Sequence, residues 1–342
     1  MIDNDILRYR TLTGSFESFK LDPNRRLISL GLFPAAPPVD GSIAEWDVLA
    51  PIRDLVSFEG KHAPASPLKL QTIAHETATM AKTLKSKDVV ATYFQDLRKI
   101  GSNERDARAA EDTIAREQMN IRRVIDIQDE FMESGILQGT LDMTLDGLAH
   151  SIDSGIVASH KFANGNVDAP IATPWSEADA DVVGLVSDIK KRIARDSGYN
   201  AAYAICGPDV LSAIRKNDQF INIFGGTESG AEISRTGMIQ RWEGLNWIEY
   251  LGTYLDADNV PQYFIPSGMI LFCPLPDRNW AETLVGTLPV PRDDDSGWDF
   301  VGGPVSYAEV KRNPVGIAIY GGKNRLPVLH VPGAVANAQV LF

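Results

Sequence analysis

The chain has 342 residues, of which 44% are hydrophobic and 23% are charged. This composition excludes a wholly disordered chain and suits two ordinary domains or one elongated subunit of several parts. The formal net charge of −12 argues against tight, sequence-independent binding to nucleic acid, which needs clustered lysines and arginines. The sequence has no apolar run of about 18 residues and no apolar run near its start, so we expect neither a membrane span nor a secretory signal.

The first 45 or so residues mix charged and apolar side chains without a sustained period. Residues 27–33 resemble a short strand, and Pro34, Pro37 and Pro38 follow it. Proline removes an amide donor and fixes its own φ angle, which disfavours regular structure. We therefore expect an extended arm that lies on another surface.

Residues 45–88 predict a long β-hairpin. Apolar side chains recur over residues 52–58, a polar segment rich in glycine and proline spans residues 59–67, and residues 68–75 alternate partly as a strand does. An isolated hairpin is marginally stable in water. We expect this one to dock elsewhere, on a neighbouring subunit.

A long amphipathic helix is the clearest element and is expected over residues 103–134. Asn103 suits the N-cap, and Gly135 stands at the expected end. The helix would be roughly 45–50 Å long, longer than a compact domain needs, and one arm of a coiled coil is the alternative interpretation. Its apolar positions follow a period near 3.6: Ala107, Ala110, Ile114, Ile121, Val124, Ile125, Phe131 and Met132.

The rest of the chain predicts a mixture of strands and helices. Residues 137–156 alternate as one or two strands, and a second compact region begins at Trp175. Helices are expected over residues 178–197, closed by Gly198, and over residues 210–216. Strands are expected over residues 199–206, 246–255, 262–264, 269–273, 306–312 and 315–320, with short apolar runs at 328–331 and 340–342. This order favours an α+β domain with a small mixed sheet.

The sequence contains few patterns that carry chemistry, and we expect no catalytic, cofactor-binding or metal-binding residues. None of the histidines stands in a metal-binding spacing, and both cysteines, Cys206 and Cys273, are expected to be buried and reduced. The glycine-rich residues 225–230 lack the Gly-Lys-Ser/Thr ending of a phosphate loop, so a surface loop is favoured. The acidic residues Asp293, Asp294, Asp295 and Asp299 could hold a divalent cation, although a solvated acidic loop is favoured. The aromatic residues Trp242, Trp247, Tyr250 and Tyr254 are expected in the core.

Many weak matches in the same order, from about Trp46 to the end of the chain, resemble the lambda-type major capsid protein family, also called capsid protein E. The family has the Hong-Kong-97-type capsid fold. The matching segments are Leu49 to Pro51 leading into Glu59 to Lys61, Ile127 to Gly135, Leu141 to Met143, Pro174 with Trp175, Ala180 with Asp181, Cys206 to Arg215, Tyr254, Tyr263 to Pro266, Gly268, and Met269 to Cys273.

The resemblance implies a subunit of four parts. These are an N-terminal arm (residues 1–44), an extended loop (45–88), a peripheral domain with a long spine helix (89–174 and 301–342) and an axial domain (175–300). It implies self-assembly into hexamers and pentamers of an icosahedral phage head that encloses double-stranded DNA. A scaffolding protein, a portal and in some cases a decoration protein are the further partners implied. The protein would not be an enzyme, would be assembled in the bacterial cytoplasm and would reside in the virion.

Two other functions remain open from the sequence. The same fold could form the shell of a cellular nanocompartment, or the chain could be a soluble metal-dependent enzyme that uses the acids from Asp293 to Asp299. For a capsid subunit, we expect the extended loop to clamp a neighbouring subunit and much of the negative charge to line the lumen. We expect no covalent cross-link through Lys61, Lys69 or Asn313.

Overall fold

The computed structural model describes residues 9–20, 25–50, 73–90, 107–145, 147–225, 239–292 and 297–342, together with residues 227, 230, 233 and 235. Predicted features on the other residues, including the tip of the extended loop at 59–67, lie outside this description. The chain divides into two compact units, which are described separately. The first comprises Met1–Ala44, Thr77–Glu133 and Thr283–Pro327, and the second comprises Glu45–Glu76, Ser134–Glu282 and Val328–Phe342.

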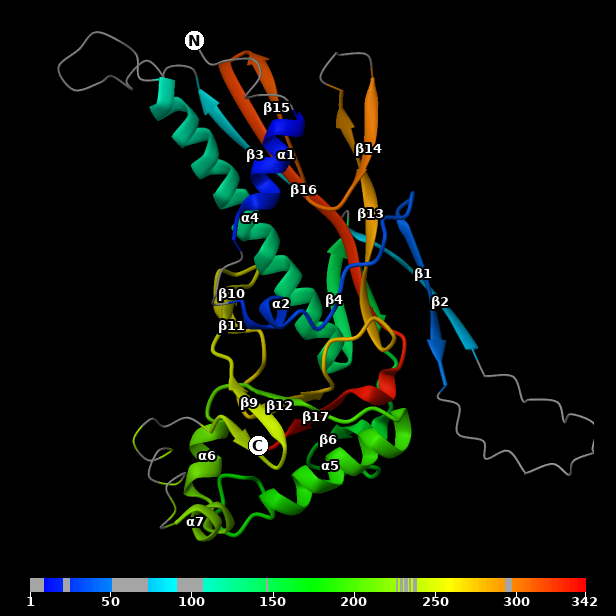
Figure 1. The fold of residues 1–342 in the computed structure, drawn as a ribbon, viewed down its shortest axis with the longest axis vertical. Helices are drawn as coiled ribbons and strands as arrows, with labels where there is room; N and C mark the ends of the chain where they lie inside the picture. Colours follow the sequence, from blue (N-terminus) through cyan, green and yellow to red (C-terminus); the bar gives the residue numbers. More distant parts are fainter. Residues whose placement is uncertain are drawn as a thin grey trace, which may run out of the picture. The chain divides into compact units, whose positions relative to one another are not determined.

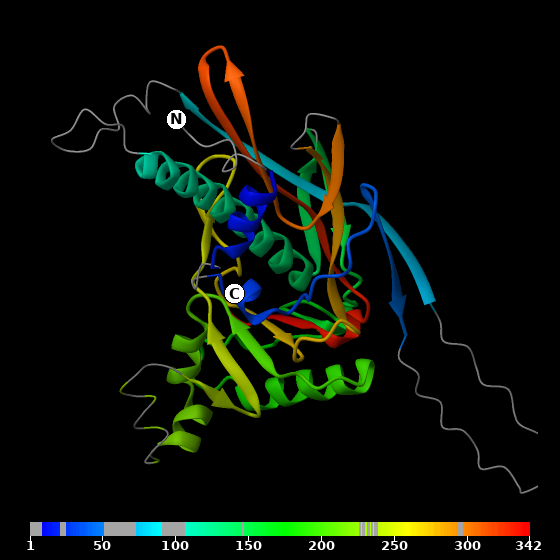
Figure 2. The ribbon, with the colours of Figure 1, turned by 45° about the horizontal axis from the view of Figure 1, so that its top comes forward.

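The first unit is built on a sheet with the strand order β14-β13-β16-β15, in which β3 also pairs with β16. The pairs β13–β14, β15–β16 and β16–β3 are antiparallel. Among the described residues, three helices lie wholly or mainly in this unit, and both views show α4 running along the sheet (Figures 1 and 2). The elements are α1 (Tyr9–Ser18), α2 (Arg26–Leu30), β3 (Ala81–Val90), α4 (Ala107–Gln138), β13 (Ala281–Pro291), β14 (Trp298–Gly302), β15 (Val305–Arg312) and β16 (Val315–Leu329).

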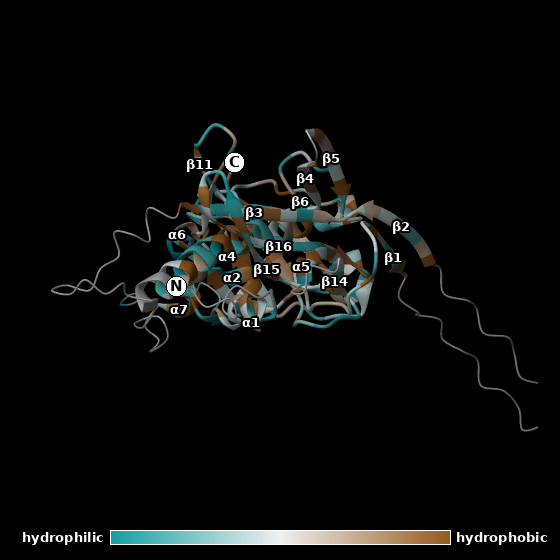
Figure 3. Cartoon of the chain, turned by 90° about the horizontal axis from the view of Figure 1, so that it is seen from above, coloured by the Kyte–Doolittle hydropathy of each residue, from teal (hydrophilic) through white to brown (hydrophobic). Residues whose placement is uncertain are grey.

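The core of the first unit lies between α4, α1 and the sheet. Ile114, Ile121 and Ile125 are spaced to share one face of α4, and they pack with Leu12 and Phe16 of α1. The ribbon of α4 alternates between hydrophilic and hydrophobic residues in Figure 3, as expected of a one-sided helix. The two helices approach β16 closely because Gly321 of this strand has no side chain. A Cβ on Gly321 would lie 2.7 Å from Ile121 of α4 and 3.1 Å from the Phe16 ring of α1.

The second unit contains a mixed sheet of six strands in the order β6-β17-β12-β7-β9-β8. The pairs β17–β6 and β7–β9 are parallel and the others are antiparallel. Two separate hairpins, β4–β5 and β10–β11, accompany it. The elements are β4 (Thr140–Leu145), β5 (Leu148–Asp153), β6 (Lys161–Phe162), α5 (Val182–Ser197), β7 (Tyr203–Cys206), α6 (Val210–Lys216), α7 (Asp218–Phe224), β8 (Arg241–Trp242), β9 (Leu245–Glu249), β10 (Thr253–Leu255), β11 (Pro261–Tyr263), β12 (Met269–Cys273) and β17 (Ala336–Gln339), with short 3-10 turns at Ala158–His160 and Pro332–Ala334.

Side chains from α5 and the sheet form the core of the second unit. Val186, Ile189 and Ile193 of α5 are fully buried, as their spacing predicted. Asp181 caps the start of this helix by accepting from the Gly184 amide, and Gly198 ends it with a φ of 79°. Trp242 and Trp247 are buried with ring centroids 5.3 Å apart. The predicted core role of these tryptophans is confirmed.

A two-stranded ribbon, β1 (Ile43–Leu49) with β2 (Ile73–Thr79), carries the base of the predicted long hairpin. Residues 51–72, which connect these strands and include 52–58, Lys61 and Lys69, lie outside the described part. β2 spans Ile73–Thr79. It overlaps the end of the strand predicted at 68–75 and continues beyond it. The following strand, β3, was not predicted from the sequence.

Several sequence predictions for individual elements were wrong. Residues 27–33 do not form a strand: Arg26–Leu30 is the helix α2, which ends at Gly31 with a φ of 65°. The expected arm is also not extended throughout, because Tyr9–Ser18 forms the helix α1 and packs in the core of the first unit. The long helix does not end at Gly135, which is helical, and continues to Gln138 before Gly139 at a φ of 114°. The polar stretch after Asp293 includes the strand β14.

The described residues contain no helix that is both long and apolar enough to span a membrane.

Candidate functional site

Among the residues that the structure describes, the acids, histidines and cysteines do not gather into a metal-binding group. Within the described ranges, no group of three or more His, Cys, Asp or Glu side chains could hold a metal ion. Asp299 forms an ion pair with Arg292, with Oδ1 and Nε 2.7 Å apart, while Asp293, Asp294 and Asp295 lie outside the description. Cys206 and Cys273 are free and buried, as predicted, and burial raises the pKa of each thiol.

Two of the histidines that the structure describes hold segments of the chain together through both ring nitrogens. His160 is fully buried, and its ring nitrogens lie 3.0 Å from the Val335 carbonyl and 3.0 Å from Asp196 Oδ2. The ring nitrogens of His330 lie 2.8 Å from the Asp47 carbonyl oxygen and 3.0 Å from Glu282 Oε1. His75 and His150 are exposed on strands, and His62 is outside the described part. These contacts fix segments of the chain and bring no nucleophile next to a base.

A cluster of buried charges lies between α4 and β16 in the first unit. The helix contributes acids spaced three or four residues apart, so they share one face. Glu130 is fully buried and accepts from the Leu27 and Ile28 amides at 2.9 and 3.0 Å. It therefore caps α2 from another element. The members of this charge cluster are Arg122, Asp126, Asp129, Glu130, Glu133, Lys323 and Arg325.

Two acid–base pairs connect the helix to the strand within the charge cluster. Asp129 pairs with both Arg325 and Lys323, and its Oδ2 lies 3.0 Å from Lys323 Nζ. Arg325 is 1% exposed and also donates to the Ile125 carbonyl at 3.1 Å. Because a buried charge without a partner is costly, these contacts specify how β16 lies on the helix.

Glu133 has the most perturbed carboxyl in the charge cluster. Burial, with a smaller contribution from the neighbouring Glu130 charge, raises the pKa of Glu133 to about 8. Burial also lowers the pKa of Lys323 to about 8 and that of Arg325 to about 9. Glu133 is only 8% exposed, so a substrate would not reach it, and we interpret the charge cluster as structural.

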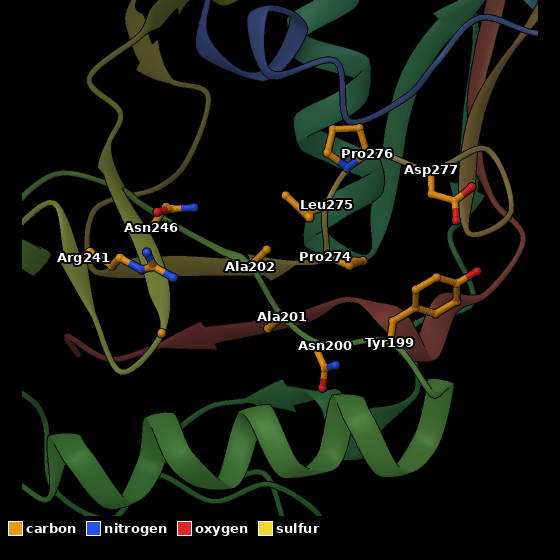
Figure 4. A pocket seen from close by; sticks show the side chains of 11 residues that line it. Tyr199, Asn200, Ala201, Ala202, Arg241, Asn246, Pro274, Leu275, Pro276 and Asp277 are labelled. Carbon is orange, nitrogen blue, oxygen red and sulfur yellow. The ribbon is translucent and has the colours of Figure 1, made fainter.

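The second unit has an open cavity of about 550 Å³ near the start of β7. Arg241 and Asn246 come from β8 and β9, while Tyr199 and Asp277 come from the segments that follow α5 and β12 (Figure 4). Burial and the Asp277 charge raise the pKa of Tyr199, which makes its phenol a weaker acid and keeps it protonated at neutral pH. The lining side chains do not present an activated nucleophile, so the cavity does not indicate a reaction.

Exposed apolar side chains are the strongest functional signal in the structure. Trp298 and Phe300 on β14 are 70% and 69% exposed. The hairpin β10–β11 exposes Leu255, and the β1–β2 ribbon exposes Ile43 and Ile73. Such groupings on thin, projecting strands indicate surfaces that associate with other chains.

The comparisons with known proteins agree with this interpretation. The family model described as phage major capsid protein E matches residues 8–340. No curated protein matches the chain.

Several solved structures have a similar fold, and three of them illustrate the likeness. A phage-related protein from Bordetella bronchiseptica RB50 has a TM-score of 0.58 and 12% identity, with 97% of each chain covered. The putative capsid protein of a prophage from E. coli CFT073 has a TM-score of 0.53 and 16% identity, with 79% of each chain covered. The capsid protein of a native GTA particle has a TM-score of 0.50 and 12% identity, covering 95% of this chain and 92% of that one.

Proposed function

The chain belongs to the phage major capsid protein E family, and on that premise we propose that its copies form the hexamers and pentamers of an icosahedral head that encloses double-stranded DNA. The observation that carries the proposal is the match of the family model over residues 8–340, nearly the whole chain. The protein is a major capsid protein, and its function is association. We propose that it catalyses no reaction.

The distribution of apolar side chains supports assembly as the function. A ribbon such as β1–β2 or a hairpin such as β10–β11 has too few strands to be stable without a covering surface. Both expose aliphatic residues, with Ile43 at 62% and Leu255 at 65%. In a shell, neighbouring copies would cover such surfaces, and each buried Å² would contribute roughly 25 cal/mol.

The four-part organisation belongs to the same proposal. We assign residues 1–44 to an N-terminal arm, 45–88 to an extended loop, 89–174 with 301–342 to a peripheral domain, and 175–300 to an axial domain. A scaffolding protein, a portal and a decoration protein are proposed partners, and assembly would take place in the host cytoplasm. The net charge of −12 would limit adhesion between the shell and the packaged DNA.

Size-exclusion chromatography with electron microscopy tests the proposal. The chain would be produced alone and together with the proposed scaffolding protein. We expect closed shells with hexameric and pentameric capsomers, at least in the presence of the scaffold. A discrete monomer or dimer under every assembly condition would contradict the proposed function.

A further inference from the structure

The hairpin β13–β14 carries an exposed apolar surface on one of its faces. Residues directly opposite each other in an antiparallel pair share a face, and the register places Pro289 beside Phe300 and Pro291 beside Trp298. We call these four residues the aromatic patch. The alternate residues Leu288 and Val290 are buried in the core on the other face. The aromatic patch therefore faces away from the interior that its own strand helps to form.

A second exposed surface in the same unit runs along α4. Arg116, Met119, Arg123 and Val124 are spaced to share a face, and we call them the helix stripe. All four are exposed, with Met119 at 38% and Val124 at 45%. This face is opposite the buried isoleucines of α4. The exposed fractions of Trp298 and Phe300, 70% and 69%, also show that the two surfaces do not cover each other within one chain.

The two surfaces are complementary in chemistry. An arginine guanidinium binds well over an aromatic ring, and methionine packs favourably at ring edges. The chain uses such contacts internally: the Arg122 guanidinium carbon lies 5.5 Å from the Phe16 ring centroid, and that of Arg192 lies 4.8 Å from the Phe162 ring centroid.

Charge complementarity also favours this pairing. The sequence that joins β13 to β14 carries three consecutive aspartates, while the helix stripe carries two arginines. Asp112, an exposed acid one turn before Arg116, offsets part of the positive charge. The remaining attraction would favour approach of the hairpin to the arginine-bearing face.

We propose that the aromatic patch of one subunit docks on the helix stripe of a neighbouring copy of the same chain. Trp298 and Phe300 pack against Met119 and Val124, and the two arginines face the aromatic rings. The contact joins two different surfaces, so it repeats from copy to copy and does not stop at a dimer. This inference rests on the proposed function, because it requires that copies assemble.

Disulfide trapping in assembled particles tests the contact. Phe300→Cys combined with Val124→Cys would be expressed as the full chain, assembled, oxidised mildly and run on a denaturing gel without reductant. The native Cys206 and Cys273 are buried and should not react. We expect covalent oligomers from the double variant and none from either single variant.

Matched controls separate this contact from its alternatives. Phe300→Cys with Val167→Cys, at a position that is 92% exposed, should give no oligomers. Dimers from Phe300→Cys alone would show that the patch meets itself and would overturn the proposal. Particles of the double variant without any cross-link would overturn it as well. That result would leave the proposed function intact, whereas a wild-type chain that never forms particles would refute both.

A measurement on the wild type does not depend on the cysteine variants. Oxidative footprinting should show Met119 and Trp298 modified at least about fivefold more slowly in particles than in dissociated subunits. Equal rates would contradict the contact.

Trp298→Ala should raise the subunit concentration needed for assembly about tenfold or more, because buried tryptophans often dominate interfaces. Leu148→Ala, at 67% exposure, should raise it much less, and equal increases would count against a specific role for Trp298.

Discussion

Among single residues, Glu133 makes the stability of the folded subunit depend on pH. Its folded-state pKa of about 8 lies above the ordinary 4.5 because burial penalises the carboxylate. The folded state therefore holds a proton that the unfolded state has lost between pH 4.5 and 8. The stabilisation from Glu133 is complete below about pH 4.5 and is lost as the pH rises towards 8. Burial lowers the pKa of Lys323 to about 8, below its ordinary 10.5. Its contribution to stability therefore rises with pH between about 8 and 10.5.

We predict that Glu133→Gln makes stability less dependent on pH. The amide resembles the protonated acid, so at pH 8 the variant should be more stable than the wild type by about 2–5 kcal/mol, with little difference at pH 5. Urea unfolding of unassembled subunits across this range measures it. Glu177→Gln, at an exposed acid, is the control. A wild-type stability that rises steadily from pH 5 to 8, parallel to that of the variant, would disprove the assignment.

A second residue-scale prediction concerns Arg325. Arg325→Ala should destabilise the subunit by about 3–5 kcal/mol, because it leaves the Asp129 carboxylate buried with one partner fewer. The exposed Arg278, which pairs with Glu282, provides the comparison, and Arg278→Ala should cost less than about 1 kcal/mol. Denaturant midpoints of the two variants decide the matter. Similar losses for both would mean that the charge cluster contributes little to stability.

At the scale of elements, α1 is an integral part of the first unit. Thr13 Oγ1 donates to the Ser306 carbonyl at 2.9 Å and accepts from the Ser306 amide at 3.0 Å, which ties the helix to β15. Gln118 of α4 donates to the Leu12 carbonyl at 3.2 Å. Phe16, with 0% exposure, adds the apolar contact. The described start of the chain therefore contributes to stability.

We predict that Phe16→Ala lowers the free energy of unfolding by about 3–5 kcal/mol, because it opens a cavity among α1, α4 and β16. Phe19→Ala, at a partly buried neighbour, should cost markedly less. Thermal or urea unfolding of the two variants gives the comparison. If Phe16→Ala has no effect, α1 does not pack as described.

Elements with a complete local pattern could be predicted, while those determined by distant contacts could not. The helix α5 has its cap at Asp181, its apolar spacing and its ending glycine in one stretch of sequence. Its existence and its end are confirmed, although it begins at Val182 and not at the expected residue 178. The short helix α2 depends on Glu130, about 100 residues away, to cap its amides. Gly135 looked like a helix end, but it lies inside α4, where the absence of a side chain makes room for Leu141. A Cβ on Gly135 would lie 3.0 Å from Leu141 Cδ1.

The buried charge cluster also depends on contacts between distant parts of the sequence. The acids of α4 were visible as a charged face, but their partners Lys323 and Arg325 lie about 200 residues away on β16. No local pattern marks such pairs as buried. Trp298 and Phe300 alternate correctly for a strand, but the aspartates before them suggested a loop. The capsid fold itself was predicted from the order of many weak matches, and the family match and the similar structures confirm it.

For the whole molecule, the extended loop leads to a prediction about assembly. Deleting residues 59–67 should leave the subunit folded but prevent stable shells, because the apolar residues at 52–58 would lose their place on a neighbouring subunit. Circular dichroism checks folding, and electron microscopy checks assembly. A normal yield of closed particles from the 59–67 deletion would refute the clamp.

The last prediction for the whole molecule is that subunits are not joined by an amide cross-link. Such a bond needs a deprotonated lysine amine in a dry site, since a protonated amine is not a nucleophile. Lys61 follows Glu59 in a polar segment, and Lys69 alternates with leucines as a solvent-facing strand residue would. Asn313, the candidate acceptor, is exposed between β15 and β16.

Boiling mature particles in detergent should therefore release a single band at the 37.4 kDa subunit mass. Non-covalent interfaces are disrupted by detergent and heat, whereas amide bonds persist. Lys61→Ala and Lys69→Ala should give the same single band as the wild type. Ladders of oligomers that disappear in either variant would show that the lysine lies in a drier and more reactive environment than its sequence indicates.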